Sequence, residues 1–311
     1  MTRPLLTLLF SVLLTCSLRA QQDPVYSQHM YNQMAINPAY AGINDLVCLV
    51  GDIRSMWTGI DGGPVTKAFH GNAPIKPFGI PSGIGLVLNM DNAGFQNNFS
   101  ANLAYSYKIS IRNGKLGIGL GLGFANQKYD NLNWLAPDGS TGGTDIVPQE
   151  KEHAAGFDLN LGTYYKTENL YMGFSVNHLV GTRLDFGNAV YQPQRSYNIL
   201  AGYRMQLSNP EFEIQPSAYL TSDGRSSQAT LNTNLEYNKK IWGGVSYRLG
   251  DAFIGMLGME IFNGVRVCYS YDFTTSDLRK SAQASHELTL AYCFNLKVDK
   301  TPQRYKSVRF L

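Results

Sequence analysis

The mature part of this sequence has no long apolar run and few charged residues. After the first 20 residues, no run reaches the roughly 18 apolar residues that a membrane-spanning helix needs. Charged residues make up only 16% of the chain, whereas an average soluble domain has about 25%. The net charge of +3 is too small to indicate a nucleic-acid partner. The composition therefore argues against a helical membrane protein, a typical soluble domain and a nucleic-acid-binding protein.

Cysteine is also rare. The chain has 4 Cys, and the first of them, Cys16, lies in the N-terminal signal described below. The three that remain, Cys48, Cys268 and Cys293, are an odd number, so the count implies no disulfide framework, and none has zinc-ligand spacing. Cys268 and Cys293 share one face of consecutive predicted strands. A disulfide between them is possible, although two small residues facing a lumen are the favoured interpretation.

The motifs of common enzymes are absent as well. The sequence contains no Gly-x-Ser-x-Gly elbow and no His-Glu-x-x-His motif, and none of its 5 His lies beside an obvious nucleophile. His286 and Glu287 lie at the start of a predicted strand and are interpreted as a pair at its rim. The acidic residues of the segment 128–152 lack the spacing of a calcium loop. We expect no enzyme activity, no cofactor and no metal.

The N-terminus has the features of a cleavable signal peptide. Arg3 precedes an apolar run that ends at Leu14, and a short region then leads to Ala20. A lipoprotein signal with Cys16 as the lipidated residue is the alternative, but Thr15 precedes it where a smaller residue is usual. We expect residues 1–20 to be removed and the mature chain to enter an oxidising compartment.

From Leu46 to Phe294 the dominant pattern is alternation of apolar and polar residues. Leu288 and Leu290, for example, enclose Thr289. Successive side chains of a β-strand point to opposite faces, so a strand between lipid and a wet lumen alternates in this way. Soluble sandwiches alternate too, but many inward polar residues would be costly in a closed core. Behind a secretory signal, the pattern predicts an all-β fold, a transmembrane antiparallel β-barrel of the outer membrane.

Connection lengths support this interpretation and suggest a direction. Fourteen strands are predicted for residues 46–296, although 12 would fit about equally. The long connections 128–152, 181–194 and 274–284 are all odd-numbered, and barrels have their longer loops on the outer side. We therefore expect both termini in the periplasm. The predicted strands are 46–57, 64–73, 82–91, 95–111, 116–127, 153–166, 170–180, 195–206, 211–221, 226–237, 241–249, 252–262, 265–273 and 285–296.

One predicted strand carries a row of glycines. Its period of two places them all on the inward face, as a lumen wall without side chains against which another segment can pack. The same spacing makes a phosphate-binding glycine loop negligible. The glycines of this wall are Gly117, Gly119, Gly121 and Gly123.

Residues 21–45 precede the alternating region and have no period. They contain the run DPVYSQHMYNQMAINPAYAG, and Arg54 and the stretch from Trp57 to Thr66 follow. These motifs resemble the PorP/SprF family of Bacteroidetes outer-membrane proteins, and the resemblance extends over essentially the whole mature chain. The residues assigned to this partner or plug motif are Asp23, Pro24, Tyr26, Ser27, Gln28, Asn37, Pro38, Ala39, Tyr40, Gly42, Trp57, Gly59 and Pro64.

The resemblance implies a non-enzymatic barrel of the type IX secretion system that functions in some members in gliding motility. It further implies contact with outer-membrane lipid and with periplasmic ring or peptidoglycan-linking proteins. Export or surface anchoring of a secreted adhesin, through its C-terminal domain, is a further implied role. The core and adhesin-dedicated roles stay open, and a passive diffusion porin and an outer-membrane enzyme are the alternatives.

Three further regions are predicted to contact partners or the lumen. Residues 21–45 are expected to fold in or under the periplasmic mouth, with Tyr26, Tyr31 and Tyr40 beside the glycine-lined wall. Trp134 and Leu135 are exposed apolar candidates for contact with an exported protein. Residues 297–311 form a basic periplasmic tail, for which solvated extension is slightly favoured over docking to an acidic partner. Its cations are Lys297, Lys300, Arg304, Lys306 and Arg309.

Overall fold

The computed structural model describes residues 23–129, 152–186 and 189–295. Several predictions from the sequence lie outside these residues. They are the signal peptide, Trp134 and Leu135, most acidic residues of the segment 128–152, and the basic tail with Lys297, Lys300, Arg304, Lys306 and Arg309.

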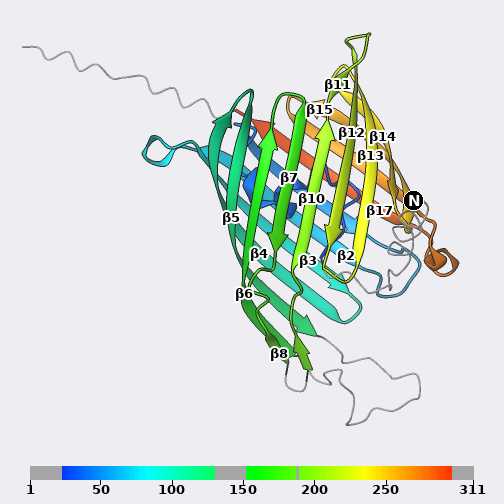
Figure 1. The fold of residues 1–311 in the computed structure, drawn as a ribbon. Helices are drawn as coiled ribbons and strands as arrows, with labels where there is room; N and C mark the ends of the chain where they lie inside the picture. Colours follow the sequence, from blue (N-terminus) through cyan, green and yellow to red (C-terminus); the bar gives the residue numbers. More distant parts are fainter. Residues whose placement is uncertain (1–22, 130–151, 187–188, 296–311) are drawn as a thin grey trace, which may run out of the picture.

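The described chain forms one large antiparallel sheet that closes on itself (Figure 1). Each long strand pairs with its neighbours in the sequence, the first strand pairs with the last, and β10 pairs with β12. The prediction of a 14-stranded antiparallel barrel is confirmed, because β11 (Met205–Gln206) is only a short extension after β10. The fourteen barrel strands are β1 (Val47–Ser55), β2 (Val65–Ile75), β3 (Ser82–Ala93), β4 (Gln96–Ile111), β5 (Gly114–Tyr129), β6 (Glu152–Lys166), β7 (Leu170–Asn177), β10 (Ser196–Tyr203), β12 (Phe212–Ser222), β13 (Ser227–Tyr237), β14 (Ile241–Arg248), β15 (Ala252–Phe262), β16 (Val265–Thr274) and β17 (Ser285–Phe294).

The helical elements are short. They are α2 (Gln33–Ile36), η1 (Pro38–Tyr40), η2 (Pro77–Gly79) and η3 (Asp277–Lys280). Among the described residues, no helix is long and apolar enough to cross a membrane.

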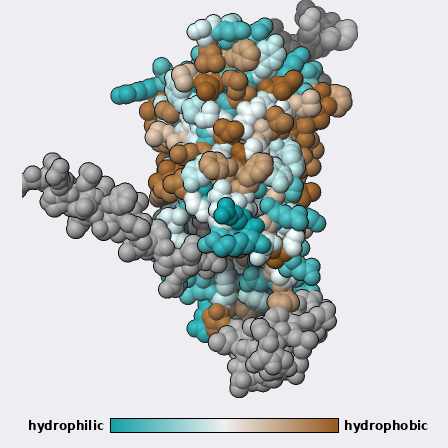
Figure 2. Space-filling view, turned by 90° about the vertical axis from the view of Figure 1, so that its right-hand side faces the viewer, coloured by the Kyte–Doolittle hydropathy of each residue, from teal (hydrophilic) through white to brown (hydrophobic). Residues whose placement is uncertain are grey.

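The alternation in the sequence becomes a division between the outside and the inside of the barrel. On β17, Leu288 and Leu290 are about half exposed on the outer wall, whereas Glu287 and Thr289 are buried inside. Figure 2 shows the result as hydrophobic surface over much of the wall, with hydrophilic residues gathered nearer the ends. Apolar side chains meet lipid at low cost, and the polar side chains face a lumen where they find partners.

The two ends of the barrel differ. We call the end that carries the even-numbered connections, such as 112–113 and 263–264, the even rim, and the opposite end the odd rim. The longest connections, 130–151, 178–195 and 275–284, all lie at the odd rim. The second of these contains a small hairpin of β8 (Leu184–Phe186) and β9 (Ala189–Tyr191). The chain enters β1 and leaves β17 at the even rim.

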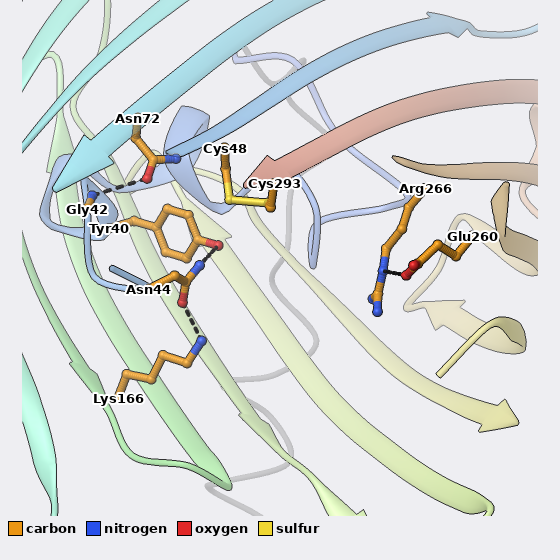
Figure 3. Close-up of a disulfide and its surroundings, with 9 residues drawn as sticks. All are labelled: Tyr40, Gly42, Asn44, Cys48, Asn72, Lys166, Glu260, Arg266 and Cys293. Atoms are coloured by element: carbon orange, nitrogen blue, oxygen red, sulfur yellow. Dashed lines mark hydrogen bonds and ion pairs between the residues drawn. A yellow bond between two sulfur atoms is a disulfide. The ribbon is translucent and has the colours of Figure 1, made fainter. Parts of the chain in front are cut away.

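A disulfide joins the first and last strands near the even rim (Figure 3). Cys48 and Cys293 are direct partners across the β1–β17 pair. Cys268 is free and buried, and its partner across β16–β17 is Thr289. Cys293 lies four positions further along β17, roughly 13 Å away, which is too far for a disulfide. The pairing of Cys268 with Cys293, which the sequence left open, therefore does not form. The favoured interpretation of two unpaired residues holds for Cys268 but is wrong for Cys293, because the closure of the barrel brings Cys48 to it.

We predict that Cys48→Ser or Cys293→Ser lowers the stability of the barrel. The bridge joins residues 245 positions apart and so constrains a large part of the unfolded chain, which typically contributes about 2–4 kcal/mol. The temperature of unfolding in detergent, followed by the mobility shift of the folded barrel on a non-reducing gel, should fall. Cys268→Ser is the matched control, and an equal fall in that variant would contradict the prediction.

Candidate functional site

Residues 23–46, which we call the lumen segment, run through the inside of the barrel (Figure 1, blue). Asp23 contacts His178, which follows β7 at the odd rim, and the segment joins β1 at the even rim. The described N-terminal end and Asn295 after β17 therefore lie toward opposite rims. The sequence predicted both termini on one side of the barrel, and this is wrong for the two described ends. The prediction that the segment lies in or under one mouth of the barrel is also wrong. These predictions failed because contacts with inward-facing residues of the wall determine the path of the segment, and such contacts cannot be read from the sequence.

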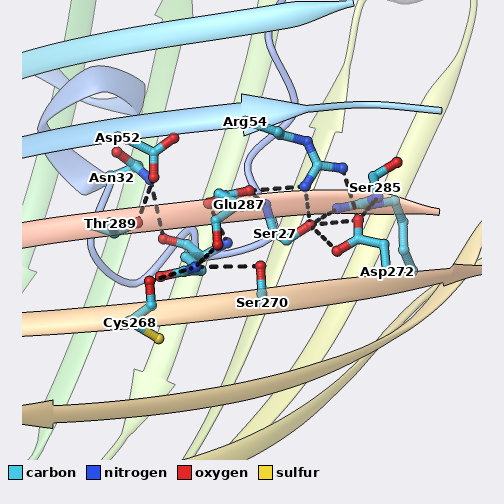
Figure 4. Close-up of polar contacts among 12 residues, drawn as sticks. Ser27, Asn32, Asp52, Arg54, Cys268, Ser270, Asp272, Ser285, Glu287 and Thr289 are labelled. Atoms are coloured by element: carbon cyan, nitrogen blue, oxygen red, sulfur yellow. Dashed lines mark hydrogen bonds and ion pairs between the residues drawn. The ribbon is translucent and has the colours of Figure 1, made fainter. Parts of the chain in front are cut away.

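Ser27 lies at the centre of a buried polar network that attaches the segment to the wall (Figure 4). Its hydroxyl accepts hydrogen bonds from Arg54 Nη1 at 2.5 Å and from Arg248 Nη2 at 2.7 Å. The same hydroxyl donates to Asp272 Oδ2 at 2.7 Å. A single serine of the segment thus joins side chains from three strands, β1, β14 and β16.

The backbone of the segment binds the fourth ionic group of this network. The N–H groups of Ser27 and Gln28 donate to the two oxygens of Glu287, at 2.7 and 2.9 Å. Arg54 completes the arrangement with ion pairs to Glu287 at 2.9 Å and Asp272 at 2.7 Å, and Arg248 pairs with Asp272 at 3.0 Å. All six residues are at most 1% exposed. Buried charges are tolerated only when they are paired in this way, so the segment and the ionic groups depend on each other.

Arg248, Asp272 and Glu287 are functional candidates that the sequence reasoning did not identify. Glu287 is also a correction: it is fully buried in the lumen, whereas its neighbour His286 points outward and bonds Tyr269, so the two are not a rim pair. The available signal was the alternation itself. It places all three charged residues on inward positions, and an inward charge in a barrel needs a partner.

A second network lies beside the first, toward the even rim. Asn32 of the segment donates to Asp52 at 3.4 Å and bonds His70 at 3.1 Å, and the Thr289 hydroxyl also donates to Asp52. Gln28 donates through its amide to Ser270 at 3.3 Å. Ser27, Gln28 and Asn32 of the motif are thus bound to the wall through both backbone and side-chain groups.

The glycines of β5 face the η1 turn of the segment. A Cβ built on Gly119 would lie 2.2 Å from the Ala39 nitrogen, and one on Gly117 would lie 2.5 Å from the Ala39 oxygen. Only residues without a side chain permit this approach of two backbones. Gly121 lies near Pro38, but Gly123 instead adjoins Asn102 and Asp158.

Four more glycines make room for the segment, although the sequence pattern did not single them out as part of the wall. Gly83 and Gly85 on β3 lie against Ala41 and Met34, and Gly162 and Gly173 lie against the side chain of Asn37. Asn37 also donates to the Thr163 and Phe174 carbonyls, at 3.0 and 3.2 Å, and accepts from Ala39 N at 2.9 Å. One asparagine therefore orients the η1 turn and bridges β6 to β7.

Two of the three tyrosines lie elsewhere than predicted, and only Tyr40 lies beside the glycine row, next to the cross-strand partner of Gly117. Tyr26 packs near Leu200 and Tyr219, and Tyr31 lies against Trp242 on another part of the wall, at a ring distance of 6.0 Å. Tyr40 packs edge-on against Tyr164 of β6. Pro38 and Ala39, rather than these rings, occupy the space over the glycine row, because backbone contact there leaves no room for an aromatic ring.

The first odd-rim connection contains three motif residues, Trp57, Gly59 and Pro64. They make no described interaction with the lumen segment and instead stabilise this connection. Trp57 N donates to Ser285 Oγ at 3.1 Å, and the Pro64 carbonyl accepts from Met56 at 2.8 Å. Gly59, with φ of +94°, lies beside the Gln283 side chain. Gly42, in contrast, belongs to the lumen segment, where its φ of +64° and its contact with Ala73 exclude a side chain.

The segment separates two cavities. The larger, about 880 Å³, opens toward the even rim, and we call it the vestibule. Charged groups and the disulfide line it, as Figure 3 shows for Lys166, Arg266 and Glu260. The smaller, about 150 Å³, lies between the segment and the odd rim, and we call it the odd-rim chamber. The described residues contain no cluster of three or more side chains suited to a metal ion.

An ionic contact holds the start of the segment at the odd-rim chamber. His178 lies between Asp23 at 2.7 Å and Asp158 at 2.9 Å. Burial lowers the pKa of His178, but the two carboxylates outweigh it, so the pKa rises well above its usual value. Burial conversely raises the pKa of Asp23, and the charge of His178 outweighs it, so this pKa falls. In contrast, burial and the charge of Arg248 lower the pKa of His29 to about 4, which leaves that imidazole neutral.

The family comparison gives a specific match. The model of the family described as type IX secretion system membrane protein PorP/SprF matches residues 18–292. No curated protein matches the chain.

Solved structures with a similar fold include three outer-membrane or transport proteins. Omp33 of Acinetobacter baumannii has 10% identity and a TM-score of 0.47, and the match covers 80% of this chain and 98% of that protein. The toluene transporter TbuX of Ralstonia pickettii has 12% identity and a TM-score of 0.47, with 84% and 92% covered. The toluene transporter TodX of Pseudomonas putida has 11% identity and a TM-score of 0.45, with 88% and 95% covered.

We predict that Gly119→Ala displaces the lumen segment. The new methyl group would lie 2.2 Å from backbone, so Ala39 has to move, at a cost of about 1–3 kcal/mol. Limited proteolysis between residues 23 and 46 should become faster. Gly121→Ala, whose nearest neighbour is 3.2 Å away, should have a small effect, and Gly51→Ala, with nothing within 4 Å, should have none. Equal proteolysis of all three variants would refute the backbone contact.

We predict a pH window for the Asp23–His178 contact. The raised pKa of His178 means that its contribution to stability is complete below pH 6.5 and is lost as pH rises through the folded value. The lowered pKa of Asp23 means that its contribution is complete above pH 3.8 and is lost as pH falls through the folded value. The difference in unfolding temperature between wild type and His178→Gln should therefore be largest between these limits. A difference that does not vary with pH would rule out the ionic contact.

Proposed function

This chain belongs to the family of type IX secretion system membrane proteins PorP/SprF, and we propose that it serves that system as a sealed outer-membrane barrel. In this role the barrel is neither a diffusion pore nor an enzyme. It supports export of secreted proteins, or holds adhesins of the gliding-motility type at the surface, while it contacts the periplasmic machinery.

One observation carries the proposal. The lumen segment lies between the two cavities and is attached to the wall by its backbone, its side chains and a buried ionic network. A barrel used for diffusion needs a hydrated path from one rim to the other. Here such a path would require release of the segment, which would leave Asp272, Glu287 and both arginines without Ser27. A buried polar group that loses its hydrogen-bond partner typically costs about 1–3 kcal/mol, and a charged group costs more.

The connection lengths support an orientation with the even rim in the periplasm. Short turns are typical of the periplasmic side of such barrels, and the longest connections lie at the odd rim. The vestibule would then open to periplasmic ring or peptidoglycan-linking proteins, and its mixed charges suit a polar protein surface. The basic residues 297–311 follow β17 at this rim and would add positive charge for an acidic partner.

The odd rim would face the outside under the same orientation. Trp134 and Leu135 belong to the connection between β5 and β6 at this rim, and they are the residues that we propose for contact with an exported protein or adhesin. The motif residues Trp57 and Gly59 would support that surface indirectly, since they contact Ser285 at the start of β17 and Gln283 before it, while Pro64 closes the first connection on Met56.

We predict that the wild-type protein is silent in a planar lipid bilayer and that deletion of residues 23–42 produces ion conductance. The deletion removes the groups that separate the two cavities. In cells, the same deletion should impair secretion and co-purification of the periplasmic machinery. Gly51→Ala, on the outer wall, is the matched control and should behave as wild type in all assays.

Two results would contradict the proposal. Steady conductance of the intact protein would favour the diffusion pore. Normal folding, secretion and co-purification after the deletion would show that the lumen segment has no part in the function. The mobility of unheated samples on a gel shows whether the deletion variant is folded. A deletion variant without the folded band is misfolded and is not used to judge conductance or secretion.

A further inference from the structure

The odd-rim chamber has an unusual polar lining. The shared feature is carboxamide side chains on neighbouring strands, which offer both donors and acceptors from short stems. They are Asn89, Asn98, Asn102, Gln127, Asn160 and Asn198. The lumen segment closes the chamber on one side, and the β8–β9 hairpin contributes Leu184 on the other.

The hairpin is fixed over the chamber by close packing. A Cβ on Gly156 would lie 2.9 Å from Leu184, and Phe186 packs edge-on against Tyr129 at a ring distance of 4.9 Å. Leu184 and Phe186 are almost fully buried. The chamber is therefore a defined cavity between two fixed elements.

Part of the lining already has internal partners. The oxygens of Asn89, Asn102 and Asn198 accept hydrogen bonds from Tyr26, Asn160 and Tyr219, at 3.2, 2.9 and 2.9 Å. These bonds fix the direction in which each amide presents its remaining polar atom. A ligand would meet an array of oriented groups, which lowers the cost of binding.

Three further oxygens on residues that line the chamber have no partner among the described residues, and one of them is Asn126 Oδ1. The other two belong to a cross-strand pair. They are Asn98 Oδ1 and Gln127 Oε1, on residues directly opposite each other across β4 and β5. Both atoms are buried, and Gln127 is only 4% exposed. A buried acceptor without a donor costs about 1–3 kcal/mol, so this pair is suited to a ligand that brings donors.

Charge and size restrict the class of ligand. Among the described residues, no lysine or arginine lines the chamber, and His178 is already held between two carboxylates, which disfavours an anion. The cavity of about 150 Å³ is smaller than the roughly 300–1,000 Å³ of drug-sized sites and suits one small ring rather than a peptide chain. The rings of Tyr26 and Tyr219 also line it and offer apolar faces.

We infer that the odd-rim chamber binds one saccharide ring of a glycan. Hydroxyl groups of a sugar would donate to Asn98 and Gln127 and would also pair with the free amide groups around them. The C–H face of the ring would pack on an aromatic side chain. This site is distinct from the secretion role proposed above and does not depend on it.

The direct test is calorimetric titration of the full mature protein in a detergent without a sugar headgroup. The probes are methyl α-glucoside, methyl α-mannoside and N-acetylglucosamine, with triglycine and calcium chloride as probes of other classes. At least one sugar should bind, and triglycine and calcium should not. Asn98→Leu and Gln127→Met, which keep side-chain size, should each weaken that sugar about tenfold because one hydrogen bond is lost.

Asn234→Leu is the matched control. Asn234 also has a buried oxygen without a described partner, but it lies on β13 and lines the vestibule rather than the chamber. Its substitution should leave the affinity for sugar unchanged. All variants should keep the wild-type unfolding temperature within a few degrees, because the oxygen that each one removes has no described partner. Gln127→Met also loses the 3.2 Å hydrogen bond from Gln127 Nε2 to the Tyr129 hydroxyl, which typically contributes about 1 kcal/mol.

Several outcomes would overturn the inference. They are no binding of any sugar, binding of triglycine or calcium instead, or equal weakening by Asn234→Leu. Where a sugar binds, titration with lipopolysaccharide micelles and with the oligosaccharide released from them distinguishes the two sources. Tighter binding of the micelles assigns a lipid-linked glycan, and equal binding assigns a soluble or protein-linked one.

Discussion

The structure depends on one constraint: two arginines and two carboxylates lie inside the barrel and must be neutralised there. Arg54, Arg248, Asp272 and Glu287 come from four different strands and are all buried. Their charges balance, and Ser27 and Gln28 of the lumen segment add hydrogen bonds to all four groups. Because an incompletely paired charge is costly when it is buried, the barrel and its segment stabilise each other.

The other features of the wall are consistent with that constraint. Glycines on β3 and β5 let the backbone of the segment approach the sheet, and glycines on β6 and β7 leave room for the Asn37 side chain. Asn37 and Ser106 satisfy polar groups that this approach would otherwise isolate. The disulfide then joins β1 to β17 close to the point where the segment enters the wall. The closing pair of strands and the attachment of the segment are therefore fixed in one region of the barrel.

Division of the lumen gives the two rims different chemistry. The vestibule is large, open to the even rim and lined with both signs of charge, which suits a protein surface. The odd-rim chamber is small, rich in carboxamides and covered by a fixed hairpin, which suits a small polar ring. Under the proposed function, the two cavities serve as separate recognition surfaces on the two sides of the barrel, and the lumen segment lies between them.

The sequence by itself determined the barrel and the side to which each residue points, because alternation is a local property of a strand, but it allowed 12 strands as well as the 14 that the structure has. It also marked residues 23–42 as a separate functional segment and the glycine row of β5 as a wall for close packing. Tertiary structure alone decided which groups meet. The Cys48–Cys293 bridge, the opposite rims of Asp23 and Asn295, and the group of Ser27 with Arg248, Asp272 and Glu287 all depend on closure of the barrel. Closure brings together residues more than 200 positions apart, and no local pattern records which inward residue faces which.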